Sequence, residues 1–109
     1  MIRKAFVMQL HAGQLDEYRR RHDPIWPELA AVLKAHGVRN YSIHLHPQTL
    51  QLFGCAEVES EERWAAIAQT PVCRQWWTHL RDLMAVNADD SPGSVGLEEV
   101  FHLPGRGAV

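Results

Sequence analysis

Residues 40–58 of this 109-residue chain, NYSIHLHPQTLQLFGCAEV, contain two strand-like segments on either side of a turn sequence. The first segment, residues 40–46, alternates apolar with polar side chains, as a strand with one buried face does. The letters HPQT predict a turn, and residues 50–58 predict a second strand, in which Gly54 would allow close packing. The two strands are close enough in the chain to form a hairpin, and the fold is built around it.

Helical patterns flank this hairpin on both sides. Before it, residues 14–35 have a helical spacing that two prolines interrupt. After it, Ser60 is expected to cap one helix, and Thr70-Pro71 is expected to start another that runs to about Met84. The hairpin therefore lies between two helical regions.

Two further strands complete the order. Residues 2–10 are largely apolar on both faces, so this strand is expected to be central, and residues 96–103 predict a last strand after the polar loop 87–94. The order strand, helix, strand, strand, helix, strand is the ferredoxin-like plan of an α+β protein, βαββαβ. We expect one α+β domain over residues 1–104 and a frayed C-terminal tail at 105–109.

The predicted sheet needs cover on both of its faces. In the ferredoxin-like plan the helices cover one face of a four-stranded antiparallel sheet. The first and third strands are apolar on both sides, so the second face must also be hidden from water. This pattern predicts that a partner subunit hides it and that the chain forms a homodimer.

The composition argues against several classes of partner. The net charge is -2, and 46% of the residues are hydrophobic and 22% charged. The run RRR at 19–21 is short and isolated, and we interpret it as a solvated helix face rather than a nucleic-acid surface. No segment approaches the roughly 18 apolar residues of a membrane span. We therefore expect neither a nucleic acid nor a membrane as partner.

The N-terminus and the cysteines point to one compartment. The segment MIRKAFVMQL lacks the long apolar run and the cleavage site of a secretory signal. Cys55 and Cys73 suggest neither a disulfide framework nor a zinc site, and both are expected to be reduced and buried. These features predict a cytoplasmic protein.

A tyrosine and a histidine meet where the first helix must break. Tyr18 and His22 are four residues apart and share a helix face, and Asp23-Pro24 follows at once. A break of this kind can turn side chains toward a cavity, and histidine moves protons near neutral pH. On this local geometry alone, the alternative is that His22 caps the helix end and Tyr18 packs in the core.

Three more aromatic residues are candidates for a binding site. Trp76 and Trp77 point about 100° apart on a helix, so one ring can face the core and the other a pocket. Tryptophan has a large apolar face and one N–H donor, which suits a sugar. Tyr41 falls on the apolar face of its strand and needs a hydrogen-bond partner, either from the protein or from a ligand. Simple core or dimer contacts are the alternative for the two tryptophans.

Other constellations are weaker. His44 and His46 could face one side of a strand, but no third ligand has convincing spacing, so no metal site is predicted and a solvent-facing pair is favoured. The sequence contains no phosphate-binding glycine loop and no Gly-x-Ser-x-Gly motif.

Six segments of the chain together resemble one known family: MIRKAFVMQL, EYRRRHDPIWPEL, NYSIHL, VESEERW, RQWW and LEEVFHLP are similar to the L-rhamnose mutarotase family. The resemblance covers residues 1–104, and the histidine-proline-tryptophan-proline stretch and the double tryptophan are its specific parts. It implies a cytoplasmic homodimer of the dimeric α/β barrel type. It also implies an isomerase that interconverts the α and β anomers of L-rhamnose without a cofactor.

The resemblance also implies roles for single residues. His22 corresponds to the family's proton donor, and Tyr18, Tyr41, Trp76 and Trp77 correspond to its sugar-binding residues. The proton acceptor stays open between a water and a carboxylate such as Glu28.

Some features stay open beside the resemblance. Residues 44–52, HLHPQTLQL, depart from the family's pattern, which leaves the roles of His44 and His46 unassigned. Whether the loop 87–95 closes over the site also stays open. The competing functions on this plan are a cofactor-free monooxygenase-like enzyme and a non-catalytic sugar-binding protein.

Overall fold

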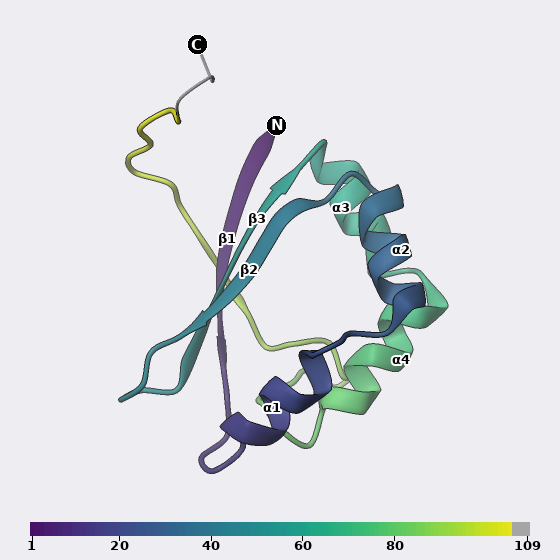
Figure 1. Cartoon of the computed structure of the whole chain (residues 1–109), viewed down its shortest axis with the longest axis vertical. Helices are drawn as coiled ribbons and strands as arrows, with labels where there is room; N and C mark the ends of the chain where they lie inside the picture. Colours follow the sequence, from purple (N-terminus) through teal and green to yellow (C-terminus); the bar gives the residue numbers. More distant parts are fainter. Residues whose placement is uncertain (106–109) are drawn as a thin grey trace.

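The computed structural model describes residues 1–105 and consists of two layers (Figure 1). A four-stranded antiparallel sheet with the order β2-β3-β1-β4 forms one layer, and the helices pack against one of its faces. The predicted α+β, ferredoxin-like plan is confirmed. In chain order the elements are β1 (Ile2–Gln9), α1 (Leu15–His22), α2 (Pro27–Ala35), β2 (Arg39–Leu45), β3 (Gln51–Val58), α3 (Glu61–Ile67), α4 (Pro71–Leu80) and β4 (Val95–Leu97).

The predicted hairpin between β2 and β3 is present. A bulge in β2 interrupts the register near its start, and the two strands pair regularly from Ser42 onward. The turn is closed by His46, whose Nδ1 accepts the backbone N–H groups of Gln48 and Thr49 at 3.2 Å each. His46 is therefore a turn-stabilising residue, and His44 is exposed, in agreement with the solvent-facing interpretation.

Strand β1 is central, as predicted, and pairs with β3 on one side and β4 on the other. Phe6 of β1 lies opposite Gly54 of β3 in the register. A Cβ atom at Gly54 would come within 2.4 Å of Cζ of Phe6, so the glycine makes room for this ring. The predicted close packing at Gly54 is thereby confirmed.

The first helical region is broken as the two prolines predict. Helix α1 ends at His22, and Asp23 has the extended backbone expected before a proline, with φ −131° and ψ 94°. The Asp23–Pro24 peptide bond is cis. Helix α2 begins with Pro27 at its first position, where the missing N–H has no intrahelical partner to lose.

The second helical region agrees with the sequence at its start and differs at its end. The Ser60 side chain accepts the N–H of Arg63 at 3.1 Å and so caps α3. Helix α4 starts at Pro71 but ends at Leu80, short of the predicted Met84. The chain leaves the helix because Met84 pairs with Leu10 at the end of β1, where both side chains are fully buried.

The last strand is shorter than predicted. Only residues 95–97 pair with β1, instead of the predicted 96–103. Beyond them the chain leaves the sheet (Figure 1), and its apolar side chains are open to solvent: Val100 is 91% exposed and Phe101 79%. The side chains of Arg3 and Glu99 still join this segment to β1, at 2.9 and 3.1 Å. Of the expected tail, residues 106–109 lie outside the described residues.

The sheet face away from the helices carries an apolar strip. Leu52 and Ala56 of β3 are buried under the helices, so the alternating Phe53 and Cys55 lie on the opposite face. Cys73 is buried as predicted, but Cys55 is exposed, and the prediction that both cysteines are buried is wrong for this position on the outer face. Val95 of β4 is also exposed there.

Candidate functional site

Two adjoining cavities lie between the sheet and the helices. The helix-break cavity, of about 610 Å³, is bordered among others by Tyr18, His22, Asp23, Tyr41 and Trp76. The Trp64 cavity, of about 640 Å³, is bordered among others by Lys4, Phe6, Tyr41, Trp64, Trp76 and Trp77. Tyr41 and Trp76 belong to both walls, so the two cavities meet at this tyrosine and this tryptophan. Both volumes are typical of small-molecule sites.

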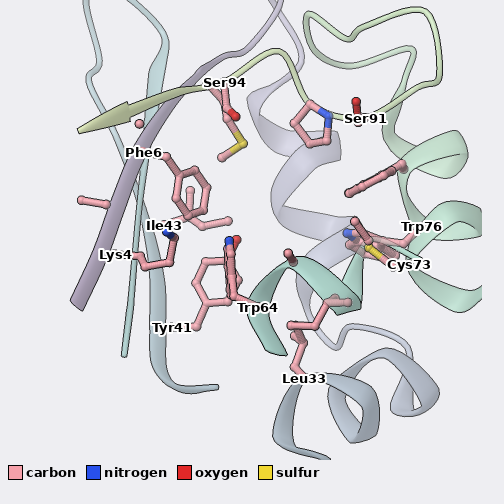
Figure 2. Close-up of a pocket in the computed structure, with 18 of the residues that line it drawn as sticks. Lys4, Phe6, Leu33, Tyr41, Ile43, Trp64, Cys73, Trp76, Ser91 and Ser94 are labelled. Atoms are coloured by element: carbon pink, nitrogen blue, oxygen red, sulfur yellow. The ribbon is translucent and has the colours of Figure 1, made fainter. Parts of the chain in front are cut away.

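Figure 2 shows the Trp64 cavity from the side. Lys4, Phe6, Ile43 and Tyr41 approach it from the sheet, and Trp76 and Cys73 approach it from α4. Ser91 and Ser94, in the chain between α4 and β4, stand at its upper edge. The cavity therefore has an aromatic interior and a polar rim.

His22, the last residue of α1, borders the helix-break cavity. Its Nδ1 lies 2.7 Å from the carbonyl oxygen of Tyr18, one turn earlier. A carbonyl oxygen only accepts, so Nδ1 carries a proton and donates it, which leaves Nε2 for a ligand. Within residues 1–105 Nε2 has no hydrogen-bond partner. Every fully buried side-chain nitrogen or oxygen in this range does have one, so the unpaired Nε2 must be accessible from the cavity.

The surroundings of His22 favour its neutral form. Burial lowers the pKa of the imidazole below its ordinary 6.5, the hydrogen bond to the Tyr18 carbonyl opposes this, and His79 adds to the lowering. At neutral pH the ring is mostly uncharged, with Nε2 as an acceptor. Once protonated, the same nitrogen is a stronger acid than an ordinary imidazolium.

Tyr18 is in the core, with its ring against His22. The two ring centres are 4.1 Å apart and the planes differ by 31°. Burial raises the pKa of the Tyr18 phenol to about 12, so its hydroxyl stays protonated. Among the described residues this hydroxyl has no protein partner and also borders open space. Tyr18 therefore both packs in the core and offers a free hydroxyl to the cavity.

Tyr41 stands where the two cavities meet. Its ring packs edge-on against Phe6 at 6.2 Å and against Trp64 at 6.1 Å. Tyr41 is 37% exposed, yet the surroundings of its phenol raise its pKa, chiefly by loss of water, with Tyr18 and Cys73 adding to the rise, so Tyr41 is also a protonated hydroxyl. The aromatic neighbours pack against the ring from the strand β1 and from the helix α3.

Both tandem tryptophans border a cavity, so the expectation that one ring faces the core and the other a pocket is only partly met. Trp76 is buried, lines both cavities and meets the His22 ring edge-on at 5.2 Å. Trp77 is half-buried, lines only the Trp64 cavity, and has the Arg74 guanidinium 5.8 Å from its ring centre. The helix-break cavity thus brings together four of the five predicted site residues, and Trp77 borders its neighbour.

Several residues at the site were not predicted. Trp26, in the link between α1 and α2, packs edge-on against Trp76 at 5.0 Å. Trp64 and Phe6 are 6.0 Å apart in the second cavity. The Lys4 ammonium pairs with the Glu61 carboxylate at 2.7 Å, on the wall of that cavity. Single aromatic residues in a strand or helix give no sequence signal for this role, because core packing needs the same residue types.

The arginine run is not a uniformly solvated face. Arg20 is 73% exposed, in agreement with that interpretation, but Arg21 is only 15% exposed. The Arg21 guanidinium bonds to Glu17 on its own helix and to Asp82 after α4. For Arg21 the interpretation is wrong, because a neighbouring helix end and a carboxylate take the place of water.

Other predicted possibilities are not brought into the site. Glu28 is exposed and lines neither cavity, so the structure does not support it as the proton acceptor. Across residues 1–105 no cluster of three or more His, Cys, Asp or Glu side chains could hold a metal ion. In the same range no helix has the length and apolar character needed to cross a bilayer.

The loop 87–95 forms a wall of the Trp64 cavity. Asn87, Ser91 and Ser94 line that cavity. Asp90 ties the loop to α4, accepting from the Thr78 hydroxyl at 3.1 Å and from the Arg81 guanidinium at 3.2 Å. In this arrangement the loop is part of the wall rather than a cover over the helix-break cavity.

Comparison with known proteins points to one family. The sequence model of L-rhamnose mutarotase matches residues 3–103. The L-rhamnose mutarotase of Opitutus terrae is 67% identical over 103 residues, which is 94% of this chain and 99% of that protein. The crystal structure of L-rhamnose mutarotase from Formosa agariphila superposes with a TM-score of 0.87 at 40% identity, covering 95% of this chain and 100% of that one.

A more distant structure shares the fold alone. A protein described as an antibiotic biosynthesis monooxygenase from Nitrosomonas europaea has a TM-score of 0.63 at 11% identity, over 93% of this chain and all of that one. Identity this low carries no function. The near-complete match to the family's sequence model and the 67% identity to a curated relative decide the assignment, and the chain belongs to the L-rhamnose mutarotase family.

Proposed function

We propose that this protein is an isomerase that interconverts the α and β anomers of L-rhamnose by opening and reclosing the pyranose ring. The family membership supports this activity. The observation that carries the chemistry is the 2.7 Å bond from His22 Nδ1 to the Tyr18 carbonyl, which turns a free Nε2 toward a cavity of sugar size. Monooxygenases on this fold are related by architecture only.

Ring opening moves two protons at neighbouring oxygens. The ring oxygen gains a proton while the anomeric hydroxyl loses one, and closure on the other face of the aldehyde reverses both steps. The imidazolium form of His22 is the proposed proton donor, from Nε2 to the ring oxygen, and the neutral ring that results takes the proton back on closure. The acceptor for the hydroxyl proton is a water or a carboxylate: Glu28 lies outside the cavity, whereas Asp23 borders it.

The aromatic residues bind the sugar in this proposal. Tyr18 and Tyr41 both border the helix-break cavity and are protonated phenols, suited to hydrogen bonds with sugar hydroxyls. The indole of Trp76 gives an apolar wall for the C–H faces and for the methyl group of a 6-deoxy sugar. Trp77 extends this wall into the adjoining cavity.

Replacing His22 with glutamine tests the chemistry. A positioned acid contributes about 10²–10⁴-fold to a proton-transfer step, so we expect the His22→Gln protein to bind L-rhamnose but lose anomer exchange by about that factor. Exchange NMR on the two anomers measures the rate, and titration measures affinity.

The chain contains a matched control for this variant. His36 at the end of α2 also bonds through Nδ1 to a carbonyl one turn earlier, that of Val32, at 2.8 Å, but lines neither cavity. His36→Gln removes the same kind of cap and should leave exchange unchanged. If the His22→Gln protein exchanges the anomers at the full rate, His22 is not the proton donor. If the wild-type protein binds the sugar but does not exchange its anomers, a non-catalytic binding protein is favoured.

We further propose a cytoplasmic homodimer of the dimeric α/β barrel type, with residues 1–104 as its one domain. Two free cysteines suit a reducing compartment. The apolar strip on the outer sheet face, with Phe53, Cys55 and Val95, suits a second copy of the chain.

Light scattering behind a sizing column tests the dimer. Phe53→Glu places a charge in the apolar strip and should give a monomer. Ala31→Glu places the same charge on the exposed side of α2 and should leave the dimer intact. A Phe53→Glu protein that stays dimeric would exclude this face as the interface.

A further inference from the structure

Arg21 joins the two helices that supply the site. On its own helix, α1, its Nε lies 2.6 Å from Oε2 of Glu17. Across to α4, its Nη1 donates to the backbone carbonyl of His79, and Nη1 and Nη2 bond to the two carboxylate oxygens of Asp82 at 2.9 and 3.2 Å. One guanidinium therefore holds three groups: Glu17 on α1, the His79 carbonyl on α4 and Asp82 just after α4.

This arginine is built in rather than adventitious. Its side chain is only 15% exposed, whereas the neighbouring Arg20 is 73% exposed and bonds to Glu17 on its own helix. The His79 carbonyl is one of the last four of α4, a group that a helix leaves without an intrahelical partner. The planar fork of arginine meets both oxygens of the Asp82 carboxylate as well as this carbonyl, a bidentate geometry that the single ammonium of a lysine does not offer.

The position of α1 depends on such contacts. The helix has eight residues, and its first residue, Leu15, follows a Gln14 that makes no side-chain cap. Helices this short are marginal without tertiary support. Arg21 is adjacent to His22, and His79 is one turn beyond Trp76, so the bonds of Arg21 connect the backbone that carries the imidazole to the backbone that carries the indole.

We propose that Arg21 is a positioning residue for the reaction, which holds the His22 imidazole against Trp76 at the distance needed for proton transfer to the bound sugar. This inference rests on the proposed role of His22. Arg21 lines neither cavity, so it acts only through the placement of α1 on α4. A misplacement of 1 Å in a catalytic group can cost about 10²-fold in rate.

The test measures kcat and KM for anomer exchange in a cycle of four proteins: wild type, Arg21→Met, His22→Gln and the double variant. We expect Arg21→Met to lower kcat about 10- to 100-fold while KM changes by less than about threefold. In the His22→Gln background, Arg21→Met should change the residual rate by less than about twofold, because the group that it positions is absent. Arg20→Met is the matched control and should stay within about twofold of wild type.

The outcomes separate this inference from the proposed function. If His22→Gln keeps full kcat, the proposed proton donor fails. If His22→Gln is inactive but Arg21→Met keeps full kcat, only the positioning role fails. The positioning role also fails if Arg21→Met lowers kcat by the same factor in the wild-type and His22→Gln backgrounds. Should Arg21→Met not fold, Asp82→Asn decides. The Asp82 side chain is 63% exposed. The Asp82→Asn substitution should lower kcat about threefold or more when His22 is present and leave the residual rate unchanged in the His22→Gln background. Full activity of Asp82→Asn would then overturn the proposal.

Discussion

Gly54→Ala should disturb the site more than it disturbs the fold. An added Cβ would lie 2.4 Å from Cζ of Phe6, and ordinary contact begins at 3.4 Å, so the ring must move by about 1 Å. Phe6 borders the Trp64 cavity, so the ring has open space to move into. The rings of Trp64 and Tyr41 lie beside it, with centres 6.0 and 6.2 Å away, so the moving ring presses on these neighbours.

The size of the effect follows from this geometry. Overpacking a filled core costs about 1–3 kcal/mol, and the lower end applies here because the displaced ring enters a cavity. A loss of about 1 kcal/mol lowers the melting temperature by about 4–8 °C in a domain of this size. Displacing the Tyr41 hydroxyl by a similar distance should weaken L-rhamnose binding about fivefold, which corresponds to about 1 kcal/mol.

A second substitution tests the cause. Phe6→Leu removes the ring atoms that collide with the new methyl group, so Gly54→Ala combined with Phe6→Leu should regain most of the stability and affinity lost relative to Phe6→Leu alone. Gly96 of β4 faces Phe6 from the other side in the register, and a Cβ there meets no atom within 4 Å. Gly96→Ala should change stability by less than about 0.5 kcal/mol. Thermal unfolding and sugar titration measure both quantities, and unchanged values for Gly54→Ala would refute this reasoning.

Three further predictions concern separate parts of the molecule. Trp76→Ala and Trp77→Ala should weaken L-rhamnose binding more than they slow the exchange step, and unchanged affinity in both single variants would make the tryptophans structural. Arg20 and Arg21 lower the pKa of Glu17 from 4.5 to about 2, so Glu17 stabilises the fold above about pH 4.5 and this contribution is lost as the pH falls toward 2. Glu17→Gln should therefore flatten the dependence of unfolding free energy on pH in that window, as urea titrations would show. Ser60→Ala removes the cap of α3 and should cost about 0.5–2 kcal/mol of stability with exchange activity unchanged, and equal urea midpoints for the two proteins would contradict the cap.

The sequence predicts the parts of the fold that local rules determine. The prolines after His22 place the helix break, the alternation in residues 40–58 places the hairpin, and Ser60 places a cap, all within a residue or two. The predicted end of the last strand was wrong because the strand ends where β4 stops pairing with the backbone of β1. This pairing depends on the assembled sheet and leaves no local sequence pattern. Helix α4 ends early for a similar reason, since Met84 pairs with Leu10 from a distant part of the chain.

The candidate site could be predicted in part. Tyr18 and His22 share a helix face by spacing alone, but their meeting with Tyr41 and Trp76 depends on how helices and sheet pack. Arg21 could not be told from its neighbours, because three identical letters in a row carry no information on which one points inward. Cys55 is exposed and Cys73 is buried. Strand alternation places Cys55 on one face of the sheet, but only the assembled fold determines that this is the face without helices.

The break between α1 and α2 has a consequence for engineering this enzyme. Replacing residues 23–26 with strong helix formers would join two short helices into one long one, and a design procedure that rewards regular backbone would favour the change. The fused helix would carry the imidazole away from its present place at a free end. A more heat-resistant protein with no useful turnover would result, so these four positions should be kept fixed in any stabilisation campaign.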